Sequence, residues 1–159
     1  MSKIEQLIQD NMSEDGAVLN LRDKYLGLRG AMELANNPAL ASVKELIMSG
    51  NQCADEGAEA LAGSSHLGNL ETLNLNHNEI GDDGAIAIAN SDKLPNLKNL
   101  SMFGNVIGDE GARTFAESVN SKKYLKLDLY KNQISNVGYK ALTESESLKN
   151  CEELEISRD

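Results

Sequence analysis

The sequence predicts an α/β solenoid, a fold in which strand–helix units of equal length stack along one axis. One observation is a column of asparagines that follow one another at intervals of 27 residues: Asn51, Asn78, Asn105 and Asn132. A column of glycines keeps the same interval: Gly57, Gly84, Gly111 and Gly138. A fixed period of this length is typical of repeat proteins, in which each unit packs only on its neighbours.

Residues 1–17 are predicted to be an N-terminal capping segment, with a helix over 2–12. Ser2 followed three residues later by Glu5 fits a capping box, which satisfies two free backbone N–H groups at a helix start. Apolar side chains then recur at helical spacing: Ile4, Leu7, Ile8 and Met12. This helix is expected to cover the first of about five and a half repeats, which occupy 18–159.

Each repeat begins with a strand signal, in which an outward residue stands between two apolar ones. Leu73-Asn74-Leu75 is one example, and equivalent triplets stand at 19–21, 46–48, 100–102, 127–129 and 154–156. Alternation with a period of two buries one face of a strand and exposes the other. We therefore expect six strands, stacked in parallel.

The column of asparagines follows the strands, and we interpret it as a structural Asn ladder. A buried amide side chain donates and accepts hydrogen bonds at once. It can therefore serve backbone groups that would each cost roughly 1–3 kcal/mol if they were buried without a partner. The first repeat has Lys24 at this position. This predicts an empty ladder position in an atypical end repeat.

A column of small polar residues comes next, just before each predicted helix: Asp55, Asp82, Asp109 and Asn136. Asp and Asn are favoured N-caps, so each is expected to cap the helix of its own repeat. A calcium ridge built from these carboxylates would need a loop rich in oxygen ligands, which is not evident. The helices bury small apolar residues on one face, for example Ala85, Ile88 and Ala89.

Both cysteines are assigned to core columns. Cys53 stands at the position of Ile80, and Cys151 stands at the position of Leu70. They are more than three repeats apart, and stacked strands are roughly 4.8 Å apart. Because a disulfide needs Cα atoms within roughly 7 Å, no intramolecular bridge is expected.

One repeat reads Leu70-x-x-Leu73-x-Leu75-x-x-Asn78-x-Ile80-Gly81-x-x-Gly84-Ala85-x-x-Ile88-Ala89. This pattern resembles the leucine-rich repeat, and more narrowly the subtype of ribonuclease inhibitor and the Ran GTPase-activating protein. The resemblance covers residues 18–159. It implies a right-handed, horseshoe-shaped arc with the parallel sheet on its concave face and the helices on its convex face. It also implies a binding surface rather than a particular function.

Partner binding is expected on the outward strand residues. Phe103 and Tyr130, two of only six aromatic residues, fall on neighbouring strands there, and exposed aromatic residues are frequent hot spots. The alternative is that the two rings only pair with each other and cover the sheet. The predicted partner-binding residues are Arg22, Ile47, Asn74, Asn76, His77, Phe103, Lys126, Asp128, Tyr130 and Lys131.

The sequence assigns no catalytic residue, metal ligand or cofactor. The two histidines, His66 and His77, do not cluster with the cysteines as a metal site requires. The repeated glycines belong to the scaffold rather than to a phosphate-binding loop. A non-enzymatic protein–protein interaction module is therefore the leading hypothesis.

The net charge of -10 and the pI of about 4.7 bear on the partner. They argue against nucleic acids and membrane surfaces, which attract Lys and Arg. One alternative function is an acidic inhibitor of a basic enzyme, although ribonuclease inhibitors are rich in Cys and Trp and this chain has two and none. A regulator like the GTPase-activating proteins is another, but no residue singles it out.

Neither a signal peptide nor a membrane span is recognisable, which predicts a cytoplasmic protein. Delivery into a host cell as a bacterial effector is an alternative that the sequence leaves open. The last predicted strand, 154–156, has no repeat after it, and an open strand edge invites pairing. We expect either self-association at this C-terminal edge or a repeat array that has been cut short.

Overall fold

The computed structural model describes residues 1–157 and confirms the α/β solenoid. Arg158 and Asp159, the last residues of the predicted repeat range, lie outside the described residues.

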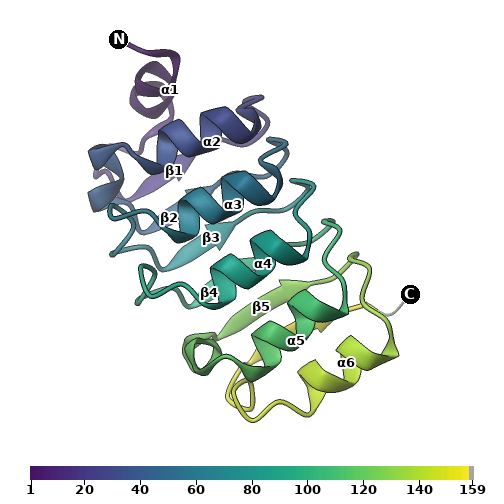
Figure 1. Cartoon of the computed structure of the whole chain (residues 1–159). Coiled ribbons are helices and arrows are strands. Elements are labelled where there is room, and N and C mark those ends of the chain that lie inside the picture. Colours follow the sequence, from purple (N-terminus) through teal and green to yellow (C-terminus); the bar gives the residue numbers. More distant parts are fainter. Residues whose placement is uncertain (158–159) are drawn as a thin grey trace.

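Strands and helices alternate along the stack (Figure 1). The strands are β1 (Val18–Asn20), β2 (Glu45–Ile47), β3 (Thr72–Asn74), β4 (Asn99–Ser101), β5 (Lys126–Leu129) and β6 (Glu153–Ile156). The helices are α1 (Lys3–Asn11), α2 (Gly27–Ala35), α3 (Ala54–Ala62), α4 (Asp82–Ala89), α5 (Asp109–Glu117) and α6 (Asn136–Thr143), with 3₁₀ helices η1 (Pro38–Ser42) and η2 (Val119–Lys123).

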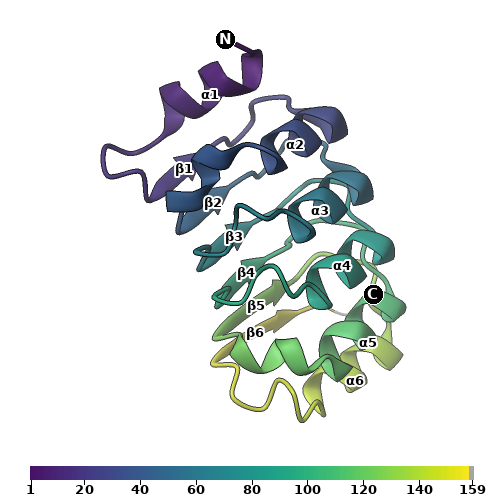
Figure 2. The same cartoon turned by 60° about the vertical axis from the view of Figure 1, so that its left-hand side comes forward.

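Within residues 1–157 the strands form one parallel, six-stranded sheet in chain order. Each strand residue pairs with the residue at the same position of the next repeat, as Leu46 does with Leu19 and Leu73. Helices α2–α6 cover one face of the sheet and leave the other uncovered (Figure 2). We call this uncovered face, which corresponds to the predicted concave surface, the strand face.

The core lies between the sheet and the helices. Leu46 of β2 and Met48, just after that strand, are fully buried in one apolar cluster with helix residues such as Leu61. Cys53 is also fully buried, as predicted, and both cysteines are free thiols. Cys151 is only half-buried, but it packs against the core cluster, so its core assignment is confirmed in part. It leads into β6, the edge strand of the described sheet, so no further described repeat covers it.

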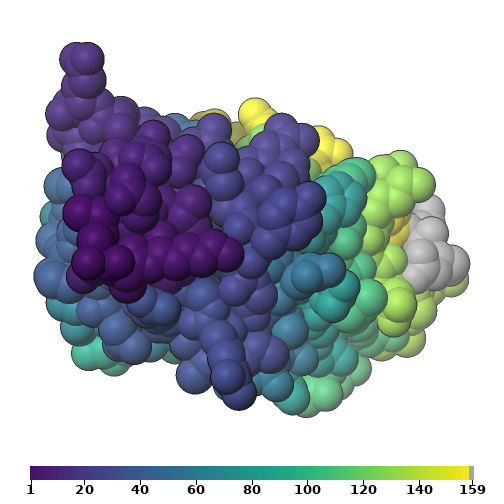
Figure 3. Space-filling model, turned by 90° about the horizontal axis from the view of Figure 1, so that it is seen from above, coloured from purple at the N-terminus to yellow at the C-terminus, as the bar shows by residue number. Residues whose placement is uncertain are grey.

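Helix α1 lies across the N-terminal end of the stack (Figure 3). The predicted capping box is present, because the Ser2 hydroxyl accepts from the Glu5 N–H at 3.1 Å and the Glu5 carboxylate accepts from the Ser2 N–H at 2.7 Å. Ile4 and Ile8 are buried in the same cluster as the repeats. The apolar face of α1 therefore shields the first repeat from water.

The Asn ladder joins each repeat to the one before it. The Asn78 Oδ1 accepts from the backbone N–H groups of Asn51 (3.0 Å) and Cys53 (3.2 Å). The Asn78 Nδ2 donates to the carbonyl of Met48 at 2.9 Å. Asn51, Asn105 and Asn132 make equivalent bonds to the preceding repeat. All four are buried, so the structural interpretation of the ladder is confirmed.

This direction explains why the first repeat has Lys24 in the ladder column. Its backbone N–H donates to the Asn51 Oδ1 at 3.0 Å, and the Leu26 N–H donates to the same oxygen at 3.3 Å. The backbone of the first repeat is thus served from the second repeat. An Asn side chain at position 24 would have no backbone of an earlier described repeat to hydrogen-bond.

The predicted role of the Asp column needs a correction. Asp82 and Asp109 are the first residues of their helices rather than the N-caps, and Asp55 is the second residue of α3. Each caps the helix of the following repeat, as the Asp55 Oδ1 does by accepting from Gly81 N at 2.8 Å and Gly84 N at 2.9 Å. Asp82 and Asp109 make equivalent bonds. Asn136 begins α6, whose own cap is the Ser135 hydroxyl.

The cap geometry also accounts for the glycine column. A Cβ at Gly84 would stand 2.8 Å from the Asp55 Oδ1 and 2.6 Å from the Ile80 side chain. Two repeat boundaries further along, the Ser135 hydroxyl donates to Asp109, and this bond, helped by backbone N–H donors, holds the pKa of that carboxyl below its ordinary value. Glycine thus lets each helix start approach the carboxylate of the preceding repeat.

A third ladder, which sequence reasoning missed, closes the other end of the helices. Hydroxyls spaced 27 residues apart donate to carbonyls near the end of the preceding helix: Ser64 to Ala35, Ser91 to Ala62, Ser118 to Ala89 and Ser145 to Ala116. The last four carbonyls of a helix lack intrahelical donors. The period of these serines was visible in the sequence, but their partners were not.

Asn78→Ala should lower the free energy of unfolding by about 3 kcal/mol or more, because it leaves two buried N–H groups and a carbonyl without that partner. Urea unfolding followed by circular dichroism measures the change. Asn90→Ala, at an exposed position after α4, is the control and should cost about 0.5 kcal/mol or less. A loss at Asn78 no larger than that of the control would contradict the ladder.

Asp82→Ala should lower the free energy of unfolding by about 1–2 kcal/mol, because it removes the cap of α5. Asp83→Ala is the matched control, since Asp83 is exposed in the same first turn of α4. The same unfolding experiment should give a loss of about 0.5 kcal/mol or less for it. Equal losses for the two variants would show that the acids act only on the dipole of their own helix.

Candidate functional site

The strand face carries most of the predicted partner-binding residues. Ile47, Asn74, Asn76, Lys126 and Asp128 line one hollow on this face. Phe103 and Tyr130 line a second hollow, which shares Lys126 and Asp128 with the first. Arg22 lies apart from both, exposed and 3.6 Å from Asp23.

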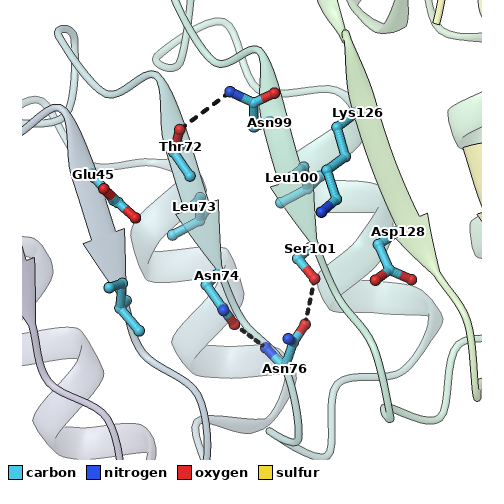
Figure 4. Close-up of a pocket in the computed structure, with 11 residues that line it drawn as sticks. Glu45, Thr72, Leu73, Asn74, Asn76, Asn99, Leu100, Ser101, Lys126 and Asp128 are labelled. Atoms are coloured by element: carbon cyan, nitrogen blue, oxygen red, sulfur yellow. Dashed lines mark hydrogen bonds between the residues drawn. The ribbon is translucent and has the colours of Figure 1, made fainter. Parts of the chain in front are cut away.

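The first hollow is polar and spans β2 to β5 (Figure 4). Four more of its lining residues also stand on the outward side of the strands but were not among the predicted binding residues: Glu45, Thr72, Asn99 and Ser101. The sequence feature that could have identified them is their position on the outward side of the strands. The hollow has a volume of about 290 Å³.

Hydrogen bonds within and between repeats orient two amide side chains of this hollow. The Asn76 Oδ1 accepts from the Ser101 hydroxyl at 2.6 Å (Figure 4). The same oxygen accepts from the Phe103 N–H at 2.8 Å. The Asn74 Oδ1 accepts from the Asn76 N–H at 3.0 Å. Both amide oxygens are therefore engaged within the protein. The amide NH₂ groups remain as donors for a ligand on the strand face.

The two rings that line the second hollow, Phe103 and Tyr130, belong to a row of rings from three successive repeats. The Phe103 and Tyr130 rings stack with centroids 6.0 Å apart and planes 15° apart. The His77 imidazole meets the Phe103 ring edge-on at 5.2 Å, and the Lys131 Nζ lies 5.7 Å from the Tyr130 centroid. The predicted pairing of the two rings is present, yet Tyr130 keeps 39% of its surface exposed. Their binding role stays a prediction.

Backbone conformation sets the place of His77 in this row. Its column has positive φ throughout the described repeats, with His77 at 55° and Gly104 at 71°. A Cβ at Gly104 would stand 2.4 Å from the imidazole of His77. The missing side chain at 104 thus makes room for the ring, which reaches Phe103 in the next repeat. The positive φ in the turn after each strand and the glycine at position 104 together allow the three rings to lie in a row.

Carboxylates surround the second hollow. Glu153 and Glu155 of β6 line it together with Asp128 of β5. Glu153 lies 3.8 Å from the Lys126 Nζ, and the Asp128 Oδ1 accepts from the Tyr130 N–H at 3.0 Å. The residues of β6 were not among the predicted binding set. The sequence feature that could have identified them is their position on the outward side of the last predicted strand.

The described residues offer little for catalysis or metal binding. Within 1–157 no group of three or more His, Cys, Asp and Glu residues is placed to hold a metal ion. His77 contacts Phe103, whereas His66 lies in a loop, where its backbone N–H donates to Ser64. Across the same part of the chain, every helix is too short or too polar to cross a membrane.

The open edge at β6 was predicted as a self-association site. Among the described strands, β6 pairs only with β5. Leu154 and Ile156 are half-buried there and pack against the core cluster. Self-association at this edge stays a prediction.

Comparison with known proteins places the fold. A family model described as "Leucine Rich repeat" matches residues 39–62, 66–89 and 93–116. The solved structure "Leiomodin-1 Actin-Binding Site 2 (ABS2)" is similar with a TM-score of 0.65 and 17% identity, over 89% of this chain and 86% of that one. The internalin inlF of Listeria monocytogenes is similar with a TM-score of 0.45 and 20% identity, over 76% of this chain and 38% of that one.

No curated protein matches the sequence. The narrower resemblance to ribonuclease inhibitor and the Ran GTPase-activating protein stays a prediction. The three segments matched by the family model begin at residues 39, 66 and 93, and so keep the 27-residue interval of the stacked strands. On this agreement between sequence and fold, the described repeats form a leucine-rich-repeat solenoid, and three segments of the chain match the model of that family.

Proposed function

We propose that the protein is a non-enzymatic interaction module that binds a protein partner through its strand face. The observation that carries this proposal is the stacked Phe103–Tyr130 pair, which lies on the face that no described helix covers. Large aromatic side chains gain more from burial in an interface than most residues. A partner that covered these rings would remove their apolar surface from water.

The rings are held in place before any partner arrives. His77 packs on one side of Phe103, and Lys131 lies over Tyr130. Side chains that are already ordered lose less conformational freedom on binding, which favours affinity. The polar hollow beside the rings supplies hydrogen-bond donors and acceptors for a rim. An apolar centre with a polar rim is the usual organisation of a protein interface.

The class of protein supports the same proposal. Leucine-rich-repeat domains generally mediate protein–protein interaction, and the similar leiomodin structure is an actin-binding site. At 17% identity that likeness concerns the fold. It supports a protein as the class of partner, and no individual partner is carried over.

An acidic inhibitor of a basic enzyme is the second candidate, because the net charge is -10 and carboxylates border the second hollow. Such an inhibitor would use the same face. Its association rate would fall steeply as ionic strength rises, because salt screens attraction between charged surfaces. Inhibition of the captured enzyme would separate this function from simple docking.

Phe103→Ala combined with Tyr130→Ala should leave the protein folded and weaken partner binding by about thirtyfold or more, the size expected when a hot spot of about 2 kcal/mol is lost. The partner is captured from cell extract with the unaltered protein and identified by mass spectrometry. Its affinity is then measured with purified proteins by calorimetry.

Val119→Ala combined with Val137→Ala is the matched control, because both valines are exposed apolar residues outside the strand face. This variant should bind the partner as the unaltered protein does. Full binding by the Phe103 and Tyr130 variant, with loss in the valine variant, would move the interface to the helix side and refute the proposal.

A further inference from the structure

We propose that the second hollow of the strand face, over β5 and β6, receives an arginine side chain of the protein partner. The inference rests on the proposed function, since it names the chemistry of the partner at that site. The hollow is lined by the Phe103 and Tyr130 rings, by the carboxylates of Asp128, Glu153 and Glu155, and by Lys126. The Lys126 ammonium pairs with Glu153, which leaves Asp128 and Glu155 as the carboxylates without an ion pair among the described residues. Aromatic faces beside carboxylates suit a cation with a flat, weakly hydrated head.

The strongest indication is a pair of like charges in register. Asp128 and Glu155 are direct neighbours on adjacent parallel strands, and both side chains line the hollow. Like charges directly opposite each other destabilise a sheet. Neither carboxylate forms an ion pair with any described residue. A cation between them would relieve this repulsion.

The same two strands show that the repulsion is not imposed by the fold. One row away on the same face, Lys126 is in register with Glu153, and their charged atoms lie 3.8 Å apart. An opposite-charge pair is therefore compatible with β5 and β6. The fold accommodates both arrangements, and the like-charge row is the one that borders the rings.

A cation of the protein already lies over one of the two rings. The Lys131 Nζ lies 5.7 Å from the Tyr130 centroid. An arginine head group can stack on a ring and also form two parallel hydrogen bonds to a carboxylate. Lysine presents a compact, strongly hydrated charge and cannot make that two-point contact.

The row of outward residues that contains Asp128 and Glu155 is charged at only one end of the sheet. The corresponding outward residues of β2 to β4 are uncharged, namely Ile47, Asn74 and Ser101, whereas β5 and β6 carry Asp128 and Glu155. A partner with an arginine at one end of its contact surface would therefore dock in one orientation. The overall charge of -10 would draw such a partner in before contact.

The test is a titration of the ¹⁵N-labelled full chain with three blocked tripeptides at low salt, followed by amide NMR. The peptides are acetyl-Gly-Arg-Gly-amide, its neutral citrulline analogue and its lysine analogue. The arginine peptide should shift the amides of Asp128, Tyr130 and Glu155 most, and should bind about tenfold tighter than the citrulline peptide.

Asp128→Asn combined with Glu155→Gln should weaken the arginine peptide by about tenfold, which corresponds to about 1.4 kcal/mol. Asparagine keeps the acceptor for the Tyr130 N–H, so the fold should be preserved. The control is Glu59→Gln combined with Glu117→Gln, which removes the same charge from exposed sites on α3 and α5. This control should bind the arginine peptide as the unaltered chain does.

Equal binding of the arginine and citrulline peptides, or an equal loss in the control variant, would overturn the arginine site. Equal binding of the lysine peptide would overturn the assignment to a guanidinium. If the captured partner still depends on Phe103 and Tyr130 in those cases, the proposed function stands without the inference. If the partner is indifferent to every strand-face substitution, the proposed function fails, and the assignment of the hollow to that partner fails with it.

Discussion

Every asparagine of the ladder accepts hydrogen bonds from the backbone of the repeat before it, and the remaining architecture depends on this constraint. Asn78 closes the turn of the second repeat through the N–H groups of Asn51 and Cys53. The turn in that repeat is buried, so water cannot replace the bonds. A repeat is thus incomplete until its successor has folded against it. The strands are held in register because each ladder residue bonds a fixed set of backbone groups in the preceding repeat, as Asn78 does with Met48, Asn51 and Cys53.

The site depends on this register. Phe103 and Tyr130 stack because they occupy the same position of adjacent repeats, and His77 joins them from the repeat before. The ladder lies directly after these positions in the chain, and it fixes the turn from which the side chains project. The proposed binding face and the turns that hold the stack together are therefore neighbouring parts of one unit. A disturbance of the ladder should reach the rings through the backbone.

The period allowed the fold, the strand positions and the Asn ladder to be predicted, because register follows from spacing alone. The period did not tell which repeat a side chain serves. Asp55 was expected to cap its own helix and caps the next one, since its carboxylate reaches across to Gly81 and Gly84. The serine ladder escaped notice for the same reason. The neighbourhood of Phe103 and Tyr130 was predictable, but the contact with His77 was not, because it depends on a side-chain direction and on the space at Gly104.

The three ladders also set a rule for changes in chain length. Each links residues that are one period apart or nearly so, and the third and fourth repeats both give and receive all three kinds of bond. Duplication or loss of 27 consecutive residues within the array would leave donors and acceptors matched at the new junction. A change of another length within a strand or the turn after it would shift the inward and outward residues and separate the ladder partners at that point. Whole units are therefore the changes in length that keep all three ladders, and each such step would carry the rings of the strand face to a new distance from α1 while leaving their mutual contacts intact.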